Sequence, residues 1–258
     1  DLMILLVNNT REPEDRDLDF RVQVATNERG GAMLHGLVRQ MGLAAVKNAI
    51  EDILAYTRRR LLNRVAELND GDHSFIRYMD DDGLGGDLVT IHATIRVRGE
   101  ELTIDFTGSS PQARGAMSLP DSALCATSYY VVKTVLDPEL LPNSGLFDAI
   151  KVTSPVGTIT NPSFPGAVGA RSITANKVAG AILGAFQGLV SRDRVMASSH
   201  DSVPAMVFSG PRRDGRGTYV YLETLGGGNG ARFDRDGMDG IHVHISNTSN
   251  LPAEALEH

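Results

Sequence analysis

Residues 88–106 read LVTIHATIRVRGEELTIDF, and this stretch decides the fold. Apolar and polar residues alternate strictly from Val89 to Val97, which puts valine and isoleucine on one face of a strand and the polar side chains on the other. Gly99 supplies a turn, and the alternation resumes at Leu102. The pattern predicts an antiparallel hairpin with one face in water.

Helical periodicity surrounds this hairpin. Apolar residues recur at spacings of three and four over residues 17–41, 43–68, 122–136 and 172–190, and each range predicts a helix. Shorter apolar runs predict further strands over residues 2–7, 73–79, 149–154, 204–209, 218–223 and 240–246. We therefore predict an α+β fold that is mixed, with mainly antiparallel β hairpins and two or three long helices. The strand order does not follow from the pattern.

Glycines inside two of the predicted helices suggest close packing. Gly30, Gly31 and Gly36 weaken the helix over residues 17–41 by about 1 kcal/mol each relative to alanine, so we expect another backbone against them. Gly180, Gly184 and Gly188 recur every four residues, and here we expect close packing of a helix on a sheet.

Composition and charge exclude several classes of function. The chain has 258 residues, 41% of them hydrophobic, and a net charge of -7, which argues against nucleic acid or an anionic membrane as a partner. No apolar run approaches the roughly 18 residues that a membrane span needs, and none has the form of a signal peptide. A cytoplasmic protein is the expectation. Cys125 is the single cysteine, and its apolar surroundings predict a buried thiol rather than a nucleophile.

The densest polar chemistry lies in residues 222–257. Four glycines open this stretch, followed by two histidines, two asparagines and a glutamate: Gly226, Gly227, Gly228, Gly230, His242, His244, Asn247, Asn250 and Glu254. The glycine cluster lacks the lysine of a phosphate-binding P-loop, so we interpret it as a loop where two backbone segments cross.

The two histidines admit several roles. On a strand over residues 240–246, His242 and His244 would face the same side, which suits a metal if a third ligand comes from elsewhere. Structural hydrogen bonds, substrate contact and metal binding all stay open. We assign no metal ligand to this chain, and we expect His242, His244, Asn247, Asn250 and Glu254 as candidate substrate-binding residues, with no catalytic residue identified.

Two other polar clusters carry little weight. The acidic run that starts at Asp80 lacks the glutamate at position twelve of a calcium loop. Ser199, His200 and Asp201 are adjacent in sequence, whereas a catalytic triad is assembled from residues that converge in space.

A set of motifs in fixed order resembles the hydantoinase B/oxoprolinase family. The motifs are N-x-R-x-P (residues 9–13), DFTGSS-x-Q (105–112), PNSG (142–145), P-x-G-x-x-x-NP (155–162), E-x-x-GGG-x-GA (223–231), DG (239–240) and N-x-x-N-x-P-x-E (247–254). They cover essentially the whole chain, which resembles the central-to-late portion of a B-type domain, truncated at both ends.

The resemblance implies ATP-dependent ring opening of a cyclic amide, a hydantoin or 5-oxoproline, within a multi-subunit, oligomeric enzyme. It implies that ATP is handled by a hydantoinase A-type subunit or domain, and that a divalent metal binds a segment before the N-x-R-x-P motif of residues 9–13. We therefore expect no cofactor on this piece and no activity from it alone. Two alternatives stay open: a non-catalytic scaffold that docks the partner, and a subunit of a related ATP-dependent ketone carboxylase.

Overall fold

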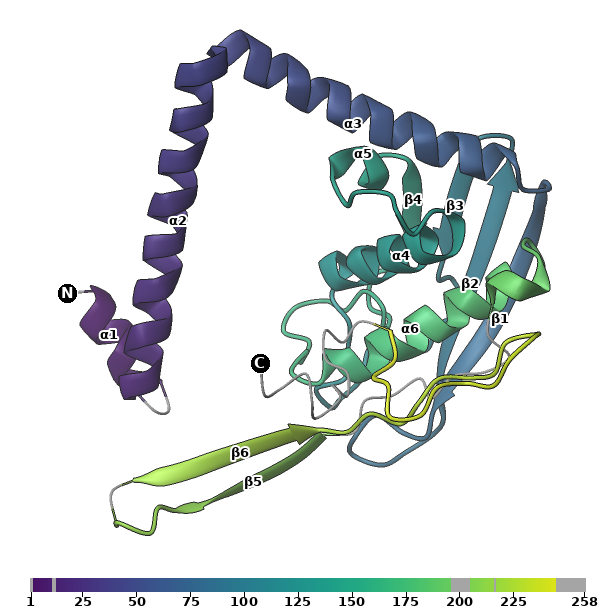
Figure 1. Ribbon diagram of the computed structural model, residues 1–258. Coiled ribbons are helices and arrows are strands. Elements are labelled where there is room, and N and C mark those ends of the chain that lie inside the picture. Colours follow the sequence, from purple (N-terminus) through teal and green to yellow (C-terminus); the bar gives the residue numbers. More distant parts are fainter. Residues whose placement is uncertain (1, 11–12, 196–204, 216, 245–258) are drawn as a thin grey trace. The chain divides into compact units, whose positions relative to one another are not determined.

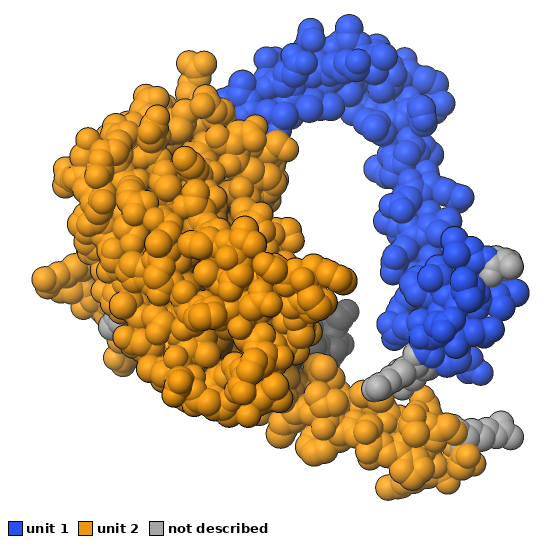
Figure 2. All heavy atoms as spheres, turned by 180° about the vertical axis from the view of Figure 1, so that it is seen from behind, with its two compact units in different colours: residues 1–55 blue, residues 56–258 orange. Residues whose placement is uncertain are grey.

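The computed structural model describes residues 2–10, 13–195, 205–215 and 217–244. The chain divides into two units, residues 1–55 and 56–258, which Figure 2 colours separately. Each unit is described by itself.

The first unit is helical. Helix α1 (Leu2–Asn8) packs against α2 (Pro13–Met41), and α3 (Leu43–Ala66) begins in this unit. The strand predicted over residues 2–7 is therefore wrong. A six-residue apolar run fits a strand and a buried helix equally well by periodicity, and its leucines and methionine are strong helix formers.

Helix α2 buries none of its residues. Nothing approaches within 4 Å of a Cβ built on Gly30 or Gly31, and one on Gly36 meets only the Arg39 side chain at 3.9 Å, so the expected backbone contact is wrong for the described residues. The helix is supported by Glu14 and Asp15 in its first turn and by the ion pairs Arg16–Asp19 and Arg21–Asp17 along its surface. Its apolar side chains stay exposed, among them Leu18, Val22, Met33, Leu34, Leu37 and Met41.

The second unit is built on a four-stranded sheet in the order β1-β2-β3-β4 (Figure 1). Strands β1 (Gly71–Met79), β2 (Val89–Arg98) and β3 (Glu101–Asp105) are antiparallel, and β4 (Ile150–Thr153) joins β3 in parallel. The predicted hairpin is confirmed. Its apolar face is the core: Ile91, Ile95 and Ile104 are fully buried.

Helices cover that apolar face. Helix α6 (Arg171–Phe186) packs on β1 and β2, and α4 (Asp121–Leu136) packs on α6. A Cβ on Gly184 would lie 2.3 Å from the Phe75 ring, and one on Gly188 would lie 2.2 Å from the His73 ring. The close helix–sheet packing predicted from the glycine spacing is confirmed at Gly184, whereas Gly188 lies in the turn that follows α6.

The remaining elements are short. They are α5 (Ser144–Phe147), the 3-10 helix η1 (Arg192–Arg194), and a separate hairpin of β5 (Ala205–Pro211) and β6 (Thr218–Thr224). Residues 240–244 form no regular strand, so the prediction for residues 240–246 is wrong over this part, and residues 245 and 246 lie outside the described residues. Cys125 is half-buried rather than buried, and burial raises the pKa of its thiol.

Candidate functional site

Two segments of the glycine-rich stretch cross after β6, in residues 226–244, which we call the crossing segment. The Gly228 amide donates to the Ile241 carbonyl at 3.0 Å, and the Asn229 amide donates to the Met238 carbonyl at 3.0 Å. A Cβ on Gly226 would lie 2.6 Å from the Gly240 carbonyl oxygen. Side chains at such a position would push the two backbones apart.

Further contacts hold the crossing segment in shape. The Asn229 side-chain oxygen accepts from the Met238 amide at 2.6 Å, and a Cβ on Gly237 would lie 2.0 Å from the Asn229 carbonyl oxygen. His244 has φ of 59°, in the left-handed region that non-glycine residues seldom adopt. The glycines therefore set the path that leads into His242 and His244.

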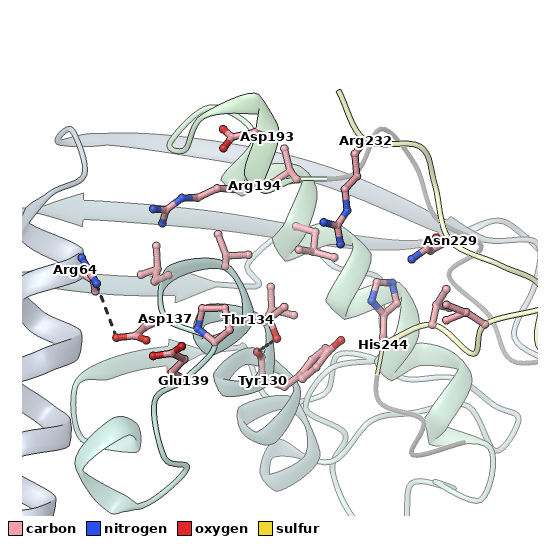
Figure 3. Close-up of a pocket in the computed structure, with 18 of the residues that line it drawn as sticks. Arg64, Tyr130, Thr134, Asp137, Glu139, Asp193, Arg194, Asn229, Arg232 and His244 are labelled. Carbon is pink, nitrogen blue, oxygen red and sulfur yellow. Dashed lines mark hydrogen bonds and ion pairs between the residues drawn. The ribbon is translucent and has the colours of Figure 1, made fainter. Parts of the chain in front are cut away.

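The crossing segment borders a cavity of about 770 Å³ within the second unit. Helix α3 contributes Arg60 and Arg64, and α4 contributes the wall that holds Tyr130 and Thr134. Residues around η1 and the crossing segment complete it: Asp193, Arg194, Val195, Asn229, Arg232, Ile241, His242, Val243 and His244. Figure 3 shows the polar side chains that surround it.

Asp137 and Arg60 form the firmest ion pair at this cavity. The guanidinium donates twice to the carboxylate, Nε to Oδ2 at 2.5 Å and Nη2 to Oδ1 at 2.7 Å. The side chain of Asp137 is only 4% exposed. Hydrogen bonding from Arg60 lowers the pKa of Asp137, so this carboxyl stays ionised and its charge is matched.

Tyr130 is a hydrogen-bond donor on the α4 wall. Burial raises the pKa of its hydroxyl, which therefore keeps its proton at neutral pH. Its half-buried ring lies on the cavity side of α4, and its hydroxyl points into the cavity (Figure 3).

Only some of the residues predicted to bind substrate lie in the described part of the chain. His242 and His244 both line the cavity, although they do not lie on a common strand face. Asn247, Asn250 and Glu254 lie outside the described residues. Tyr130, Arg194 and Arg232 were not predicted from the sequence. Arginines on a surface and a tyrosine within a helix are ordinary, and only their convergence in space singles them out.

The DFTGSS motif has a structural role. Ser110 Oγ accepts from the Thr90 amide at 2.9 Å, and Ser109 Oγ accepts from the His92 amide at 3.1 Å. Asp105 accepts from the amide and the hydroxyl of Thr107. The motif therefore ties the end of β3 back onto the neighbouring strand β2.

The acidic run at Asp80 has a structural explanation too. Asp82 accepts from Arg114 Nε at 2.9 Å and from the Arg114 amide at 3.2 Å. In the described part of the chain, no three His, Cys, Asp or Glu side chains are placed to hold a metal ion together.

The fold and these motifs define a hydantoinase B-type protein. The chain matches the Hydantoinase B/oxoprolinase family over residues 1–258 and belongs to it. It is 29% identical to the B-type subunit of a putative D-/L-hydantoinase from Pseudomonas sp. (strain NS671), over 98% of this chain and 44% of that protein. It is 27% identical to 5-oxoprolinase 1 of Arabidopsis thaliana, over 97% of this chain and 20% of that protein.

A solved structure supports the fold. The ATP-dependent caprolactamase from Pseudomonas jessenii matches 93% of this chain and 42% of its own, with a TM-score of 0.77 and 22% identity. The chain thus spans less than half the length of these relatives. Among the described residues, no helix is long and apolar enough to cross a membrane.

Proposed function

We propose that this chain is part of the B-type subunit of an ATP-dependent enzyme that opens a cyclic amide, a hydantoin or 5-oxoproline. The observation that carries the proposal is the family match along the whole chain, together with relatives named for hydantoinase and 5-oxoprolinase activity. The cavity of the second unit supports it, since it combines polar donors with an apolar wall.

The chain's own contribution is to bind and orient the ring. An unstrained amide resists attack by water, so ATP supplies the activation when the enzyme is complete. We assign ATP to a hydantoinase A-type partner, and the divalent metal of the family to a segment other than the residues described. Tyr130 and Asn229 can donate hydrogen bonds to a ring carbonyl, and His242 and His244 are further candidates for substrate contact.

Partner docking is the second candidate function. The observation that favours it is α2, a 29-residue helix with no buried residue and with several large exposed apolar side chains. A helix of this kind is typical of a surface that another protein covers. A scaffold role and a catalytic role are compatible within one protein.

The test measures ATP hydrolysis that depends on added hydantoin or 5-oxoproline. The full-length B-type protein is combined with its A-type partner, and then this chain replaces the full-length protein. We expect coupled hydrolysis in the first case and none in the second. Turnover by the short chain contradicts the assignment of essential groups to other segments. Loss of all cyclic-amide dependence in the complete enzyme contradicts the activity.

A further inference from the structure

Two arginines at the cavity are not held by neighbouring carboxylates. Arg194 and Arg232 both line it, and within the part of the chain that the structure describes neither has a carboxylate within ion-pair distance. Asp234 pairs with Arg235 at 3.0 Å, and it feels the charge of Arg232 only from beyond ion-pair distance, as Asp193 feels that of Arg194. A guanidinium left in this state at a cavity is ready to bind an external anion.

Arg232 is the better placed of the two. Figure 3 shows its guanidinium directed into the cavity on the side of His244, whereas Arg194 extends toward the side that Arg64 borders. The Tyr130 hydroxyl points into the same part of the cavity as His244. Arg232 and Tyr130 therefore offer donors from two different elements, the crossing segment and α4.

The acidic groups at the cavity do not cancel this site. Asp137 is matched by Arg60 through two hydrogen bonds. The Glu139 side chain is 88% exposed and lies 3.8 Å from Arg60. Asp193 is hydrogen-bonded to Ser191, which lowers its pKa, and it is exposed. Arg232 is exposed as well, and solvent screens its charge as it screens that of Glu139 and Asp193. The anion preference near Arg232 therefore rests on its guanidinium having no carboxylate within ion-pair distance among the described residues.

Apolar side chains line the rest of the cavity. Val131 and Val135 come from α4, Leu183 comes from α6, and Val243 of the crossing segment is 4% exposed. Val131 is fully buried, whereas Leu183 is half-buried and offers apolar surface on which the methylene groups of a small lactam ring can pack while a charged substituent reaches Arg232. The cavity volume of about 770 Å³ accommodates a ligand of this size.

We propose that the cavity selects a cyclic amide that carries a carboxylate, and that Arg232, with Tyr130, binds this carboxylate. The inference rests on the proposed function, and it narrows the substrate from cyclic amides in general to those with an acidic substituent, such as 5-oxoproline. The ring packs against the apolar wall, and the charged group gives the selectivity over neutral lactams.

The experiment measures binding, so it does not depend on turnover. Calorimetric titration of the full-length B-type protein compares 5-oxoproline with 2-pyrrolidinone, which has the same ring without the carboxylate. Arg232→Gln is expected to weaken 5-oxoproline binding by about tenfold to a hundredfold, the usual range for a charged hydrogen bond. It should change 2-pyrrolidinone binding by less than about twofold, because no charge is involved.

Matched variants separate the site from a general charge effect. Arg213→Gln makes the same charge change in the exposed turn between β5 and β6, and it should leave both affinities unchanged. Tyr130→Phe removes a single hydroxyl and should weaken 5-oxoproline binding by about threefold to tenfold. Circular dichroism establishes that each variant is folded.

Three results overturn the proposal. If Arg232→Gln weakens the binding of 5-oxoproline and of 2-pyrrolidinone equally, Arg232 acts on the fold or on the ring rather than on the carboxylate. If the variant binds both ligands as tightly as the original protein does, the carboxylate binds elsewhere or not at all. Inorganic phosphate that binds through Arg232 more tightly than 5-oxoproline identifies a phosphate site instead. Selective binding without ATP-coupled turnover would refute the proposed function alone, and turnover with no effect of Arg232→Gln would refute this inference alone.

Discussion

Arg60 of α3 and Asp137, the residue that follows α4, form a bidentate ion pair, with Nε–Oδ2 at 2.5 Å and Nη2–Oδ1 at 2.7 Å. Asp137 is 4% exposed, while Arg60 is 29% exposed. The buried carboxylate has little access to water and needs the guanidinium as its hydrogen-bond donor, whereas the more exposed guanidinium can be hydrated without Asp137.

Asp137→Ala is expected to lower the free energy of unfolding by about 1–2 kcal/mol, because two charge-assisted hydrogen bonds are lost but Arg60 regains water. Urea denaturation followed by circular dichroism measures it. Glu139→Ala is the control: its side chain is 88% exposed and 3.8 Å from Arg60, so the change should stay within about 0.5 kcal/mol. Equal losses in the two variants would contradict a special role for Asp137.

The acid sensitivity of the fold should depend on the same pair. Hydrogen bonding from Arg60 lowers the pKa of Asp137, so the folded state holds fewer protons than the unfolded state in acid. This stabilisation is complete above the unfolded pKa of about 3.9 and is lost as pH falls toward the lowered folded value. We expect Asp137→Ala to flatten the stability curve below pH of about 4, measured by thermal unfolding across a pH series. An unchanged slope would show that other carboxyls control it.

Substitution by alanine should have opposite effects on stability at two glycines that lie in helices. A Cβ on Gly184 of α6 meets the Phe75 ring at 2.3 Å, whereas one on Gly30 of α2 meets nothing within 4 Å. Gly184→Ala should destabilise the second unit by about 1–3 kcal/mol through overpacking, despite a gain of up to about 1 kcal/mol in helix propensity. Gly30→Ala should raise helicity. Denaturant titration and circular dichroism measure both, and stabilisation by Gly184→Ala would contradict the observed packing.

Hydrophobic periodicity predicted most of the helices and strands of the second unit. The alternation between Val89 and Val97 placed the core face correctly, because the apolar side chains of β2 all point into the core. The opposite face is half-buried rather than wet, and Thr94 on it is only 8% exposed. The parallel pairing of β3 with β4 did not follow from the sequence. The two strands are joined through α4, α5 and the loops around them, and nothing local in residues 106–149 encodes which edge β4 joins.

The candidate site was only partly predictable. Glycine clusters mark close backbone approach, so the crossing near Gly226 and Gly228 could be anticipated, and with it the region of His242 and His244. The supposed strand face of the histidines was wrong, since residues 240–244 follow an irregular path. Arg232 and Tyr130 are 102 residues apart in sequence, and only the folded chain brings them to one cavity.

Asp105 of the DFTGSS motif should act on stability rather than on ligand binding. It accepts from the Thr107 amide at 3.0 Å, the Thr107 hydroxyl at 2.8 Å and the Thr153 hydroxyl at 3.2 Å, and it pairs with Arg96 at 2.9 Å. Asp105→Asn keeps the size but loses the charge and one acceptor, and it should cost about 1–3 kcal/mol. Denaturation measures the loss. A variant of full stability with impaired 5-oxoproline binding would place Asp105 at a site instead.

Gly237 offers the sharpest test of the crossing segment. A Cβ there would lie 2.0 Å from the Asn229 carbonyl oxygen, so Gly237→Ala forces the two backbones apart and breaks the hydrogen bond from the Asn229 amide to Met238. Hydrogen exchange at the Gly228 and Asn229 amides should accelerate by at least about tenfold, while exchange in β2 and α6 stays unchanged. The four-stranded sheet serves as the internal control, because it lies outside the crossing segment.

The same variant links the crossing to the cavity. Arg232 lies between Asn229 and Gly237, so opening the segment displaces its guanidinium. Binding of 5-oxoproline should then weaken about as much as in Arg232→Gln. Gly215→Ala, which strains a glycine of φ 72° in the separate β5–β6 turn, should leave this binding unchanged. Fast exchange at the Asn229 amide with undiminished 5-oxoproline affinity would mean that Arg232 does not depend on the crossing for its position.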